Sequence, residues 1–113
     1  MSEITITDLQ KAQKLYQQDI VTAEKLKALQ VTPNWKLIIE DGFLRDNVDN
    51  IVGSLATIDE ASKQRYLSIL TGIAAFKEYL LQLTNRGDEA VSNLKDTEEA
   101  LNQLLGADYD QSN

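Results

Sequence analysis

The stretch Ser62–Leu83 (SKQRYLSILTGIAAFKEYLLQL) constrains the fold more than any other part of the chain, because its apolar content is the densest. Its large apolar side chains recur mostly at steps of three and four residues, at Tyr66, Ile69, Leu70, Ile73, Phe76, Leu80 and Leu83. On a helix, where successive residues turn by about 100°, these positions form one broad stripe. A stripe of this width has to be buried, so the sequence predicts a central apolar helix that other segments cover.

Composition also favours helices. The 113 residues include five glycines and one proline, which are too few turn residues for a β-sandwich. The length suits one domain that can bury a core of its own. We therefore expect a single all-α domain at residues 1–106, followed by a polar, acidic tail at 107–113.

Two or three helices are expected before the central one. Thr7 and Gln10 have the spacing of a capping box, and the helix that they begin extends to about residue 29. Its apolar face consists of Leu9, Ala12, Leu15, Tyr16, Ile20, Ala23, Leu26 and Leu29. Thr32 and Pro33 then form a cap and a first helical residue, which predicts a second helix with Trp35 on its buried face.

The apolar pattern changes sides in the segment after Trp35. In a continuous α-helix, the apolar residues from Leu44 to Leu55 would point away from the Trp35 side. Either a straight helix is buried on two faces, or the chain kinks or breaks near Gly42–Asp46. We favour the kink or break, because glycine weakens a helix and Asp46 can cap a new one.

The end of the chain predicts one more helix. Thr57 or Asp59 can cap the central helix, and Gly87 is suited to end it in the left-handed conformation. Between Asp88 and the stop expected at Gly106, the residues Ala90, Leu94, Thr97, Leu101 and Leu104 alternate at four and three, which is a narrow heptad seam. The seam suits packing on the first helix or pairing with a partner helix. The expected fold is an all-α bundle of four to five helices, at about 7–29, 33–43, 46–56, 59–84 and 88–105.

The residues available for chemistry are few. The chain has no cysteine and no histidine, and its 18 acidic residues outnumber 11 basic ones, for a net charge of −7. Carboxylates near Glu40–Asp41, Asp46–Asp49 and Glu98–Glu99, and the tail Asp108–Ser112, have spacings that capping and surface charge explain. We expect no enzyme activity, no metal or cofactor, no direct nucleic-acid binding and no membrane span.

Three features in the middle of the chain form one pattern: the stretch Thr32–Leu44 (TPNWKLIIEDGFL), the acidic helix after it, and the block Phe76–Leu80 (FKEYL). This pattern resembles a family of small all-helical accessory proteins of tailed bacteriophages. It covers roughly residues 30–84. It implies a phage setting and an accessory role, with no assigned active site.

These features together predict a non-enzymatic structural or assembly accessory protein of a phage particle. It would act by helix-mediated self-association or by docking on a larger protein, with Ala90, Leu94, Leu101 and Leu104 as contact residues. The alternative is an acidic phage inhibitor that binds a basic surface of a host defence or transcription protein. We expect synthesis in the host cytoplasm, with the virion as a later location.

Overall fold

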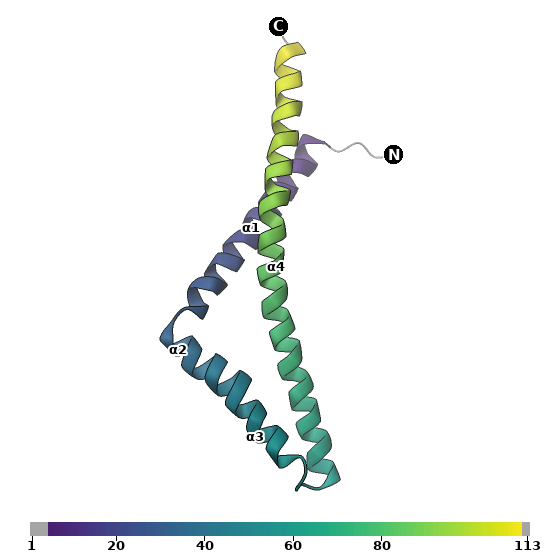
Figure 1. Ribbon diagram of the computed structural model, residues 1–113. Coiled ribbons are helices and arrows are strands. Elements are labelled where there is room, and N and C mark those ends of the chain that lie inside the picture. Colours follow the sequence, from purple (N-terminus) through teal and green to yellow (C-terminus); the bar gives the residue numbers. More distant parts are fainter. Residues whose placement is uncertain (1–4, 112–113) are drawn as a thin grey trace. The chain divides into compact units, whose positions relative to one another are not determined.

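Residues 5–111 are described by a computed structural model, and they form three helical stretches (Figure 1). The first is α1 (Ile6–Gln30). The second is made of α2 (Pro33–Trp35), η1 (Lys36–Asp46) and α3 (Asn47–Ser54) in direct succession. The third is α4 (Glu60–Gln111). The all-α class is confirmed, but the predicted bundle of four to five separate helices is wrong.

The start of α1 is capped two residues earlier than predicted. Thr5 accepts the backbone N–H of Asp8 on its hydroxyl at 3.1 Å, and its own N–H donates to the Asp8 carboxylate at 3.2 Å. This reciprocal pair is a capping box. It replaces the box predicted at Thr7 and Gln10.

The second stretch begins as the sequence predicts. The Thr32 hydroxyl accepts the N–H of Trp35 at 3.2 Å, and Pro33 is the first helical residue. Proline suits this position because a first-turn N–H has no partner within the helix.

A change of helical pitch replaces the predicted kink or break near Gly42–Asp46. η1 is a π-helix, and at its end the Asn47 N–H bonds to the Gly42 carbonyl five residues earlier. A π-helix has about 4.4 residues per turn against 3.6 in an α-helix, so each residue turns by about 80°. Over the 11 residues of η1, this difference keeps the apolar residues on the Trp35 side. They are half-buried or buried at Ile39, Leu44, Val48, Ile51 and Leu55.

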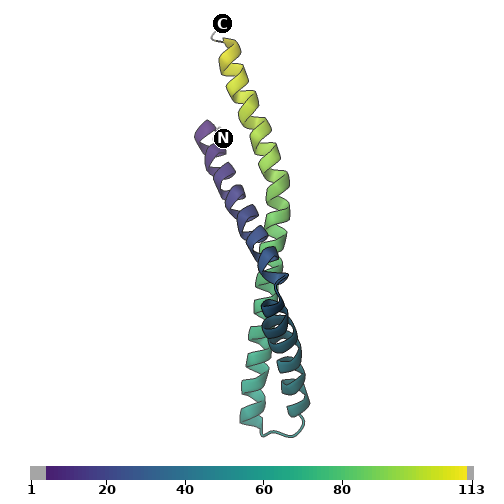
Figure 2. The same ribbon diagram turned by 90° about the vertical axis from the view of Figure 1, so that its left-hand side faces the viewer.

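α4 unites the two last predicted helices into one helix of 52 residues (Figure 2). Asp59 caps it, as one of the two predicted candidates, by accepting the Ser62 N–H at 2.7 Å. Gly87 and Gly106 were predicted to end helices, but α4 runs through both of them. No glycine among the described residues adopts a positive φ. The side chains of the predicted tail, 107–113, lie outside those that the structure describes.

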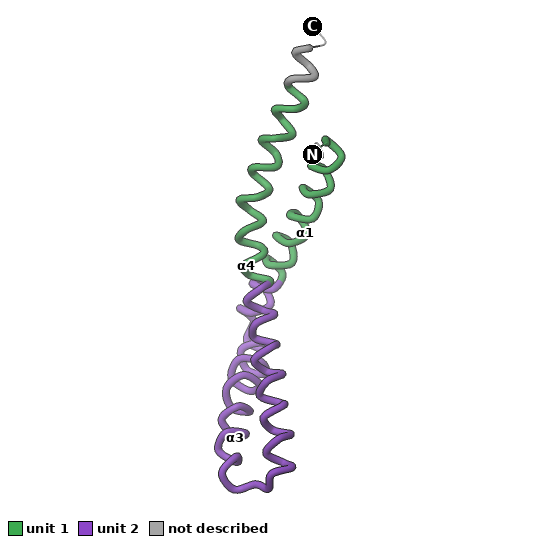
Figure 3. The backbone as a smooth tube through the Cα atoms, turned by 90° about the vertical axis from the view of Figure 1, so that its right-hand side faces the viewer, with its two compact units in different colours: residues 1–25, 83–113 green, residues 26–82 purple. Residues whose placement is uncertain are grey.

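The chain divides into two compact units (Figure 3). Unit 1 contains the chain up to Lys25 and from Leu83 onwards, so it pairs most of α1 with the second part of α4. The two helices approach closely where Gly87 meets the Cβ of Ala23. Unit 2 is Leu26–Gln82 and pairs the second helical stretch with the first part of α4.

Few side chains are buried in either unit. In the described part of the chain, the buried apolar side chains are Leu26, Ile51, Ile73, Ala90 and Leu101. Among the residues that the structure describes, fifteen large apolar side chains are exposed, including Leu15 and Leu29, which the sequence placed on the buried face of α1. The predicted bundle of four to five helices around a central apolar helix is therefore wrong.

Candidate protein-interaction surface

One face of α4 is occupied within the chain. We call it the inner stripe, and it consists of Tyr66, Ile73, Phe76, Leu80, Leu83, Gly87, Ala90, Leu94, Thr97 and Leu101, all buried or half-buried. The steps are sevens, fours and threes throughout. The central apolar stripe and the terminal heptad seam of the sequence are thus one heptad pattern, which continues through Gly87.

Aromatic packing shows what the inner stripe meets in unit 2. Phe76 of α4 contacts Phe43 of η1 edge-to-face, with ring centroids 5.8 Å apart at an angle of 83°. Such pairs are preferred by the charge distribution of aromatic rings. The half-buried Trp35 side chain has its indole N–H covered, with no hydrogen-bond acceptor among the described residues.

The four predicted contact residues lie in unit 1. Ala90 is 1% exposed and Leu101 is 7% exposed, whereas Leu94 is half-buried and Leu104 is exposed. Leu94 and Leu101 follow Gly87 at intervals of seven, so they share the side of α4 on which Gly87 meets Ala23 of α1. Their burial is what packing on α1 produces. A role for these four residues in binding a partner stays a prediction.

A second apolar stripe on α4 is largely uncovered within unit 2: Leu67, Ala74 and Leu81 are exposed, and only Leu70 is half-buried. We call it the outer stripe, and it consists of Leu67, Leu70, Ala74 and Leu81. Leu67 is 41% exposed and Leu81 is 53% exposed. Sequence reasoning missed this stripe because it assigned Leu70 to the single broad face and left Leu67 and Leu81 out. The signal was the interval of seven from Leu67 to Ala74 and again to Leu81.

The helix around Leu67, Leu70 and Ala74 carries almost no polar surface. No charged residue lies between Arg65 and Lys77. The two aliphatic hydroxyl side chains there, Ser68 and Thr71, donate to backbone carbonyls four residues earlier, both at 3.0 Å. A helix that is apolar all round is normally buried on all sides. Here Leu67, Ala74 and Leu81 remain exposed beside the inner stripe.

The second helical stretch adds further exposed apolar side chains to unit 2. Leu37 and Ile38 of η1 and Val52 of α3 are all exposed, as is Val31 before Pro33. Single exposed apolar residues are ordinary, so these four add to the exposed apolar surface of unit 2 without forming a defined patch.

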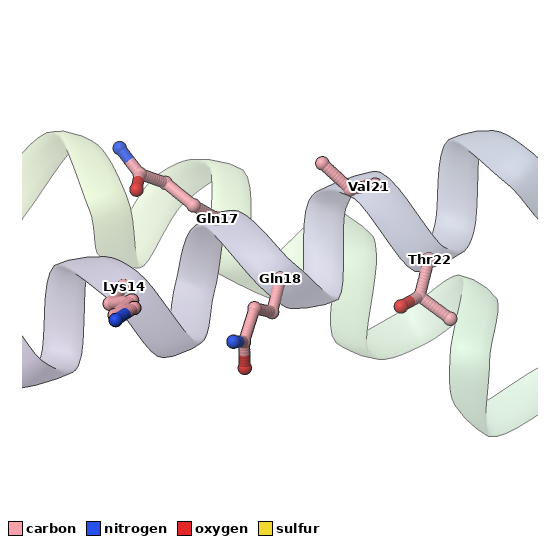
Figure 4. A pocket seen from close by; sticks show the side chains of 5 residues that line it. All are labelled: Lys14, Gln17, Gln18, Val21 and Thr22. Atoms are coloured by element: carbon pink, nitrogen blue, oxygen red, sulfur yellow. The ribbon is translucent and has the colours of Figure 1, made fainter.

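Two hollows of the described surface are open to solvent. One follows α1 and is lined by Lys14, Gln17, Gln18, Val21 and Thr22 (Figure 4). Its lining comes from one side of a single helix, so it does not enclose a ligand. Another lies between α3 and α4, next to Ile51 and Tyr66.

The shifted pKa values belong to exposed helix ends and an ion pair. Hydrogen bonds from the backbone and side chain of Thr5 lower the pKa of Asp8, and those from Ser62 lower the pKa of Asp59. A hydrogen bond to Asp46 and the charge of Asp41 raise the pKa of Arg45. Among the described residues, no group of three or more acidic side chains is placed to hold a metal ion. These groups have structural roles that the geometry explains.

Comparisons of the chain with protein-family models, with curated proteins and with solved structures find no match. Within the part of the chain that the structure describes, no helix is both long enough and apolar enough to cross a bilayer.

Proposed function

We propose that this chain is a non-catalytic helical interaction protein, whose uncovered apolar surface is completed by another protein. The observation that carries the proposal is the outer stripe of α4, together with the exposed apolar side chains of η1 and α3 in the same unit. Few apolar side chains are buried within the chain. Covering the exposed ones would therefore add stabilising apolar burial. The partner is a second copy or a larger protein.

The biological setting that we propose is assembly of a bacteriophage particle. It rests on the resemblance of residues 30–84 to small helical phage proteins. An accessory protein of this kind needs a binding surface and no active site. The exposed apolar surface of unit 2 falls within the same part of the chain.

An acidic inhibitor of a basic host protein is the second candidate, and the charge of unit 1 favours it. Unit 1 contains eleven acidic and five basic residues, whereas unit 2 contains seven and six. A strongly acidic helix pair would attract a basic partner surface and steer its approach.

Thermal unfolding at several protein concentrations tests the proposal, followed by circular dichroism and combined with light scattering and an apolar fluorescent dye. If association completes the fold, the unfolding temperature rises with protein concentration. If the partner is a larger protein, the isolated chain stays monomeric and binds the dye through its exposed apolar side chains. A monomer that unfolds cooperatively and does not bind the dye would contradict the proposed function.

A further inference from the structure

We infer that η1 is a switch between two helical registers, and that its register decides whether α3 packs on α4. In the π-register of the structure, α3 is docked and its residue Ile51 is buried. In an α-register of the same segment, α3 turns a polar face to α4 and is released. The inference goes beyond the proposed function, because it rests on packing within unit 2 and on no partner.

The length and the setting of η1 are the first reason. π-helical turns normally occur singly inside α-helices, often at functional sites, whereas η1 has 11 residues. It joins the α-helical segments α2 and α3 directly. Pro33 is the only proline of the chain, so an α-helix can extend from it through the whole stretch.

The start of η1 gains apolar burial in the α-register. Around an α-helix Ile38 lies about 60° from Trp35, whereas around a π-helix it lies about 120° away. The structure accordingly leaves Ile38 62% exposed, although Trp35 is half-buried. Conversion to an α-helix therefore brings Ile38 to the side that Trp35 occupies.

The end of the stretch favours the π-register instead. Exchanging the 11 π-helical steps for α-helical ones turns α3 by about 220°. That rotation turns Ile51 away from α4 and brings Asp46 and Asp49 to within about 40° of the Trp35 side. Carboxylates are costly to place against apolar side chains, so α3 leaves α4. Since Ile51 is the buried residue of α3, a small contact holds the π-register.

Gly42 makes this balance accessible to a single substitution. A Cβ at Gly42 would lie 3.1 Å from the carbonyl oxygen of Leu37, five residues earlier in the π-register. Alanine is the best α-helix former, so Gly42→Ala disfavours the π-register and favours the α-register. Gly53→Ala is the matched control. It adds a methyl group to the same stretch, but a Cβ there meets no atom within 4 Å.

Hydrogen-bond couplings measured by NMR on the full chain report the register directly. In the structure the Asn47 N–H bonds to the Gly42 carbonyl, five residues earlier. In the α-register its acceptor is the Phe43 carbonyl, four residues earlier. We expect Asn47 to couple to residue 42 in wild type and in Gly53→Ala, and to Phe43 in Gly42→Ala.

Thiol labelling reports the release of α3. The chain has no cysteine, so Ile51→Cys introduces a single thiol at the docked side of α3. Adding Gly42→Ala should raise the labelling rate on the order of tenfold or more, and adding Gly53→Ala should leave it unchanged.

A second variant reaches the α-register by another route. Asp46→Leu with Asp49→Leu replaces the two carboxylates that keep α3 from packing on α4 in that register. Both side chains are exposed in the structure, so the π-register loses no packing. The Asn47 coupling should move to Phe43 in this variant as well, which keeps the inference testable where Gly42→Ala does not fold.

Two outcomes overturn the inference. One is a coupling of Asn47 to residue 42 that persists in both variants. The other is faster labelling at position 51 with loss of helical circular dichroism and no coupling to Phe43, because α3 then unfolds instead of changing register. Neither outcome bears on the proposed function, which does not depend on the register of η1.

Discussion

At the scale of single residues, Gly87 shows how a local signal can mislead. The sequence Asn85-Arg86-Gly87-Asp88 has the composition of a helix end, yet α4 continues through it without a positive φ. The glycine is needed for space, because a Cβ at this position would meet the Cβ of Ala23 on α1. The interval of seven from Leu80 to Gly87 and again to Leu94 was the signal for this role.

Gly87→Ala should therefore destabilise the chain even though alanine is the better helix former. The methyl group forces α1 and α4 apart, which we expect to lower the free energy of unfolding by about 1–2 kcal/mol after the gain in helix propensity. Gly72→Ala on the same helix is the control, because a Cβ there meets no atom within 4 Å. It should raise the free energy of unfolding by up to about 1 kcal/mol. Urea denaturation measures both.

A compensating change identifies the contact itself. Adding Ala23→Gly to Gly87→Ala moves the methyl group from one helix to the other and keeps the space between them. The double variant should recover most of the lost stability. If it is less stable than Gly87→Ala alone, Ala23 is not the neighbour that limits residue 87.

Caps were the residues most open to prediction, because a cap depends on a few neighbours in sequence. Thr32 with Pro33, and Asp59, are confirmed. The first helix had two threonines two residues apart, each followed at the third position by a side chain that can reach back. Thr5 with Asp8 forms the box that the structure adopts.

The Asp59 cap gives a pH dependence of known sign. Hydrogen bonds from Ser62 lower the pKa of Asp59 in the folded chain. As the pH falls, Asp59 is therefore protonated in the unfolded chain before it is protonated in the folded chain. Its contribution to stability is present above the unfolded pKa of about 3.9 and is lost as pH falls through the folded value. Asp59→Asn keeps a capping oxygen without the ionisation. Urea denaturation should show wild type as the more stable at neutral pH and the difference shrinking below about pH 4; a difference that does not change with pH would contradict this.

At the scale of the helical elements, η1 is the part that periodicity could not reveal. The sequence was analysed with 100° per residue, and on that assumption Leu44–Leu55 had to change sides. The π-helical turn removes the conflict without breaking the chain. Glycine at position 42 fits this geometry, because a Cβ there would lie 3.1 Å from the Leu37 carbonyl oxygen.

Shortening η1 by two residues should convert it to an α-helix without moving the buried side chains. Nine α-helical residues turn through about the same angle as the 11 residues of η1. Deleting Glu40 and Asp41 should therefore change the free energy of unfolding by less than about 1 kcal/mol, since the deletion removes one exposed ion pair. Deleting Asp49 and Asn50 is the control: it turns Ile51 away from α4 and should cost several kcal/mol. If thermal unfolding shows the same loss of stability for both deletions, the π-helical turn does not determine which side chains face α4.

The candidate surface was predictable only in kind. The heptad seam correctly indicated that this part of the chain packs on another helix, but it could not identify that helix. Ala90 and Leu101 are buried in unit 1, whereas the uncovered stripe at Leu67 and Leu81 lies in unit 2. The sequence pattern identifies which helix faces are apolar. Which helix packs on each face depends on contacts between residues that are distant along the chain.

At the scale of the whole molecule, the error in the predicted bundle has one physical origin. A chain of 113 residues was assumed to bury its own apolar stripes. The merging of two predicted helices into α4 leaves fewer separate helices to cover one another. Fifteen large apolar side chains among the described residues remain exposed, and this excess is the reason to expect a partner.

Ionic strength distinguishes the two functions at this scale. Each copy has a net charge of −7, most of it from unit 1, so two copies repel each other at long range while their apolar contact is insensitive to salt. Raising the salt from 0.01 M to 1 M shortens the screening length from about 30 Å to about 3 Å. The dissociation constant of the dimer, measured by sedimentation equilibrium, should therefore fall several-fold. An inhibitor held on a basic surface by carboxylates would lose affinity over the same range. Weaker self-association at high salt would mean that ion pairs hold the two copies together, because an apolar stripe has no charges for salt to screen.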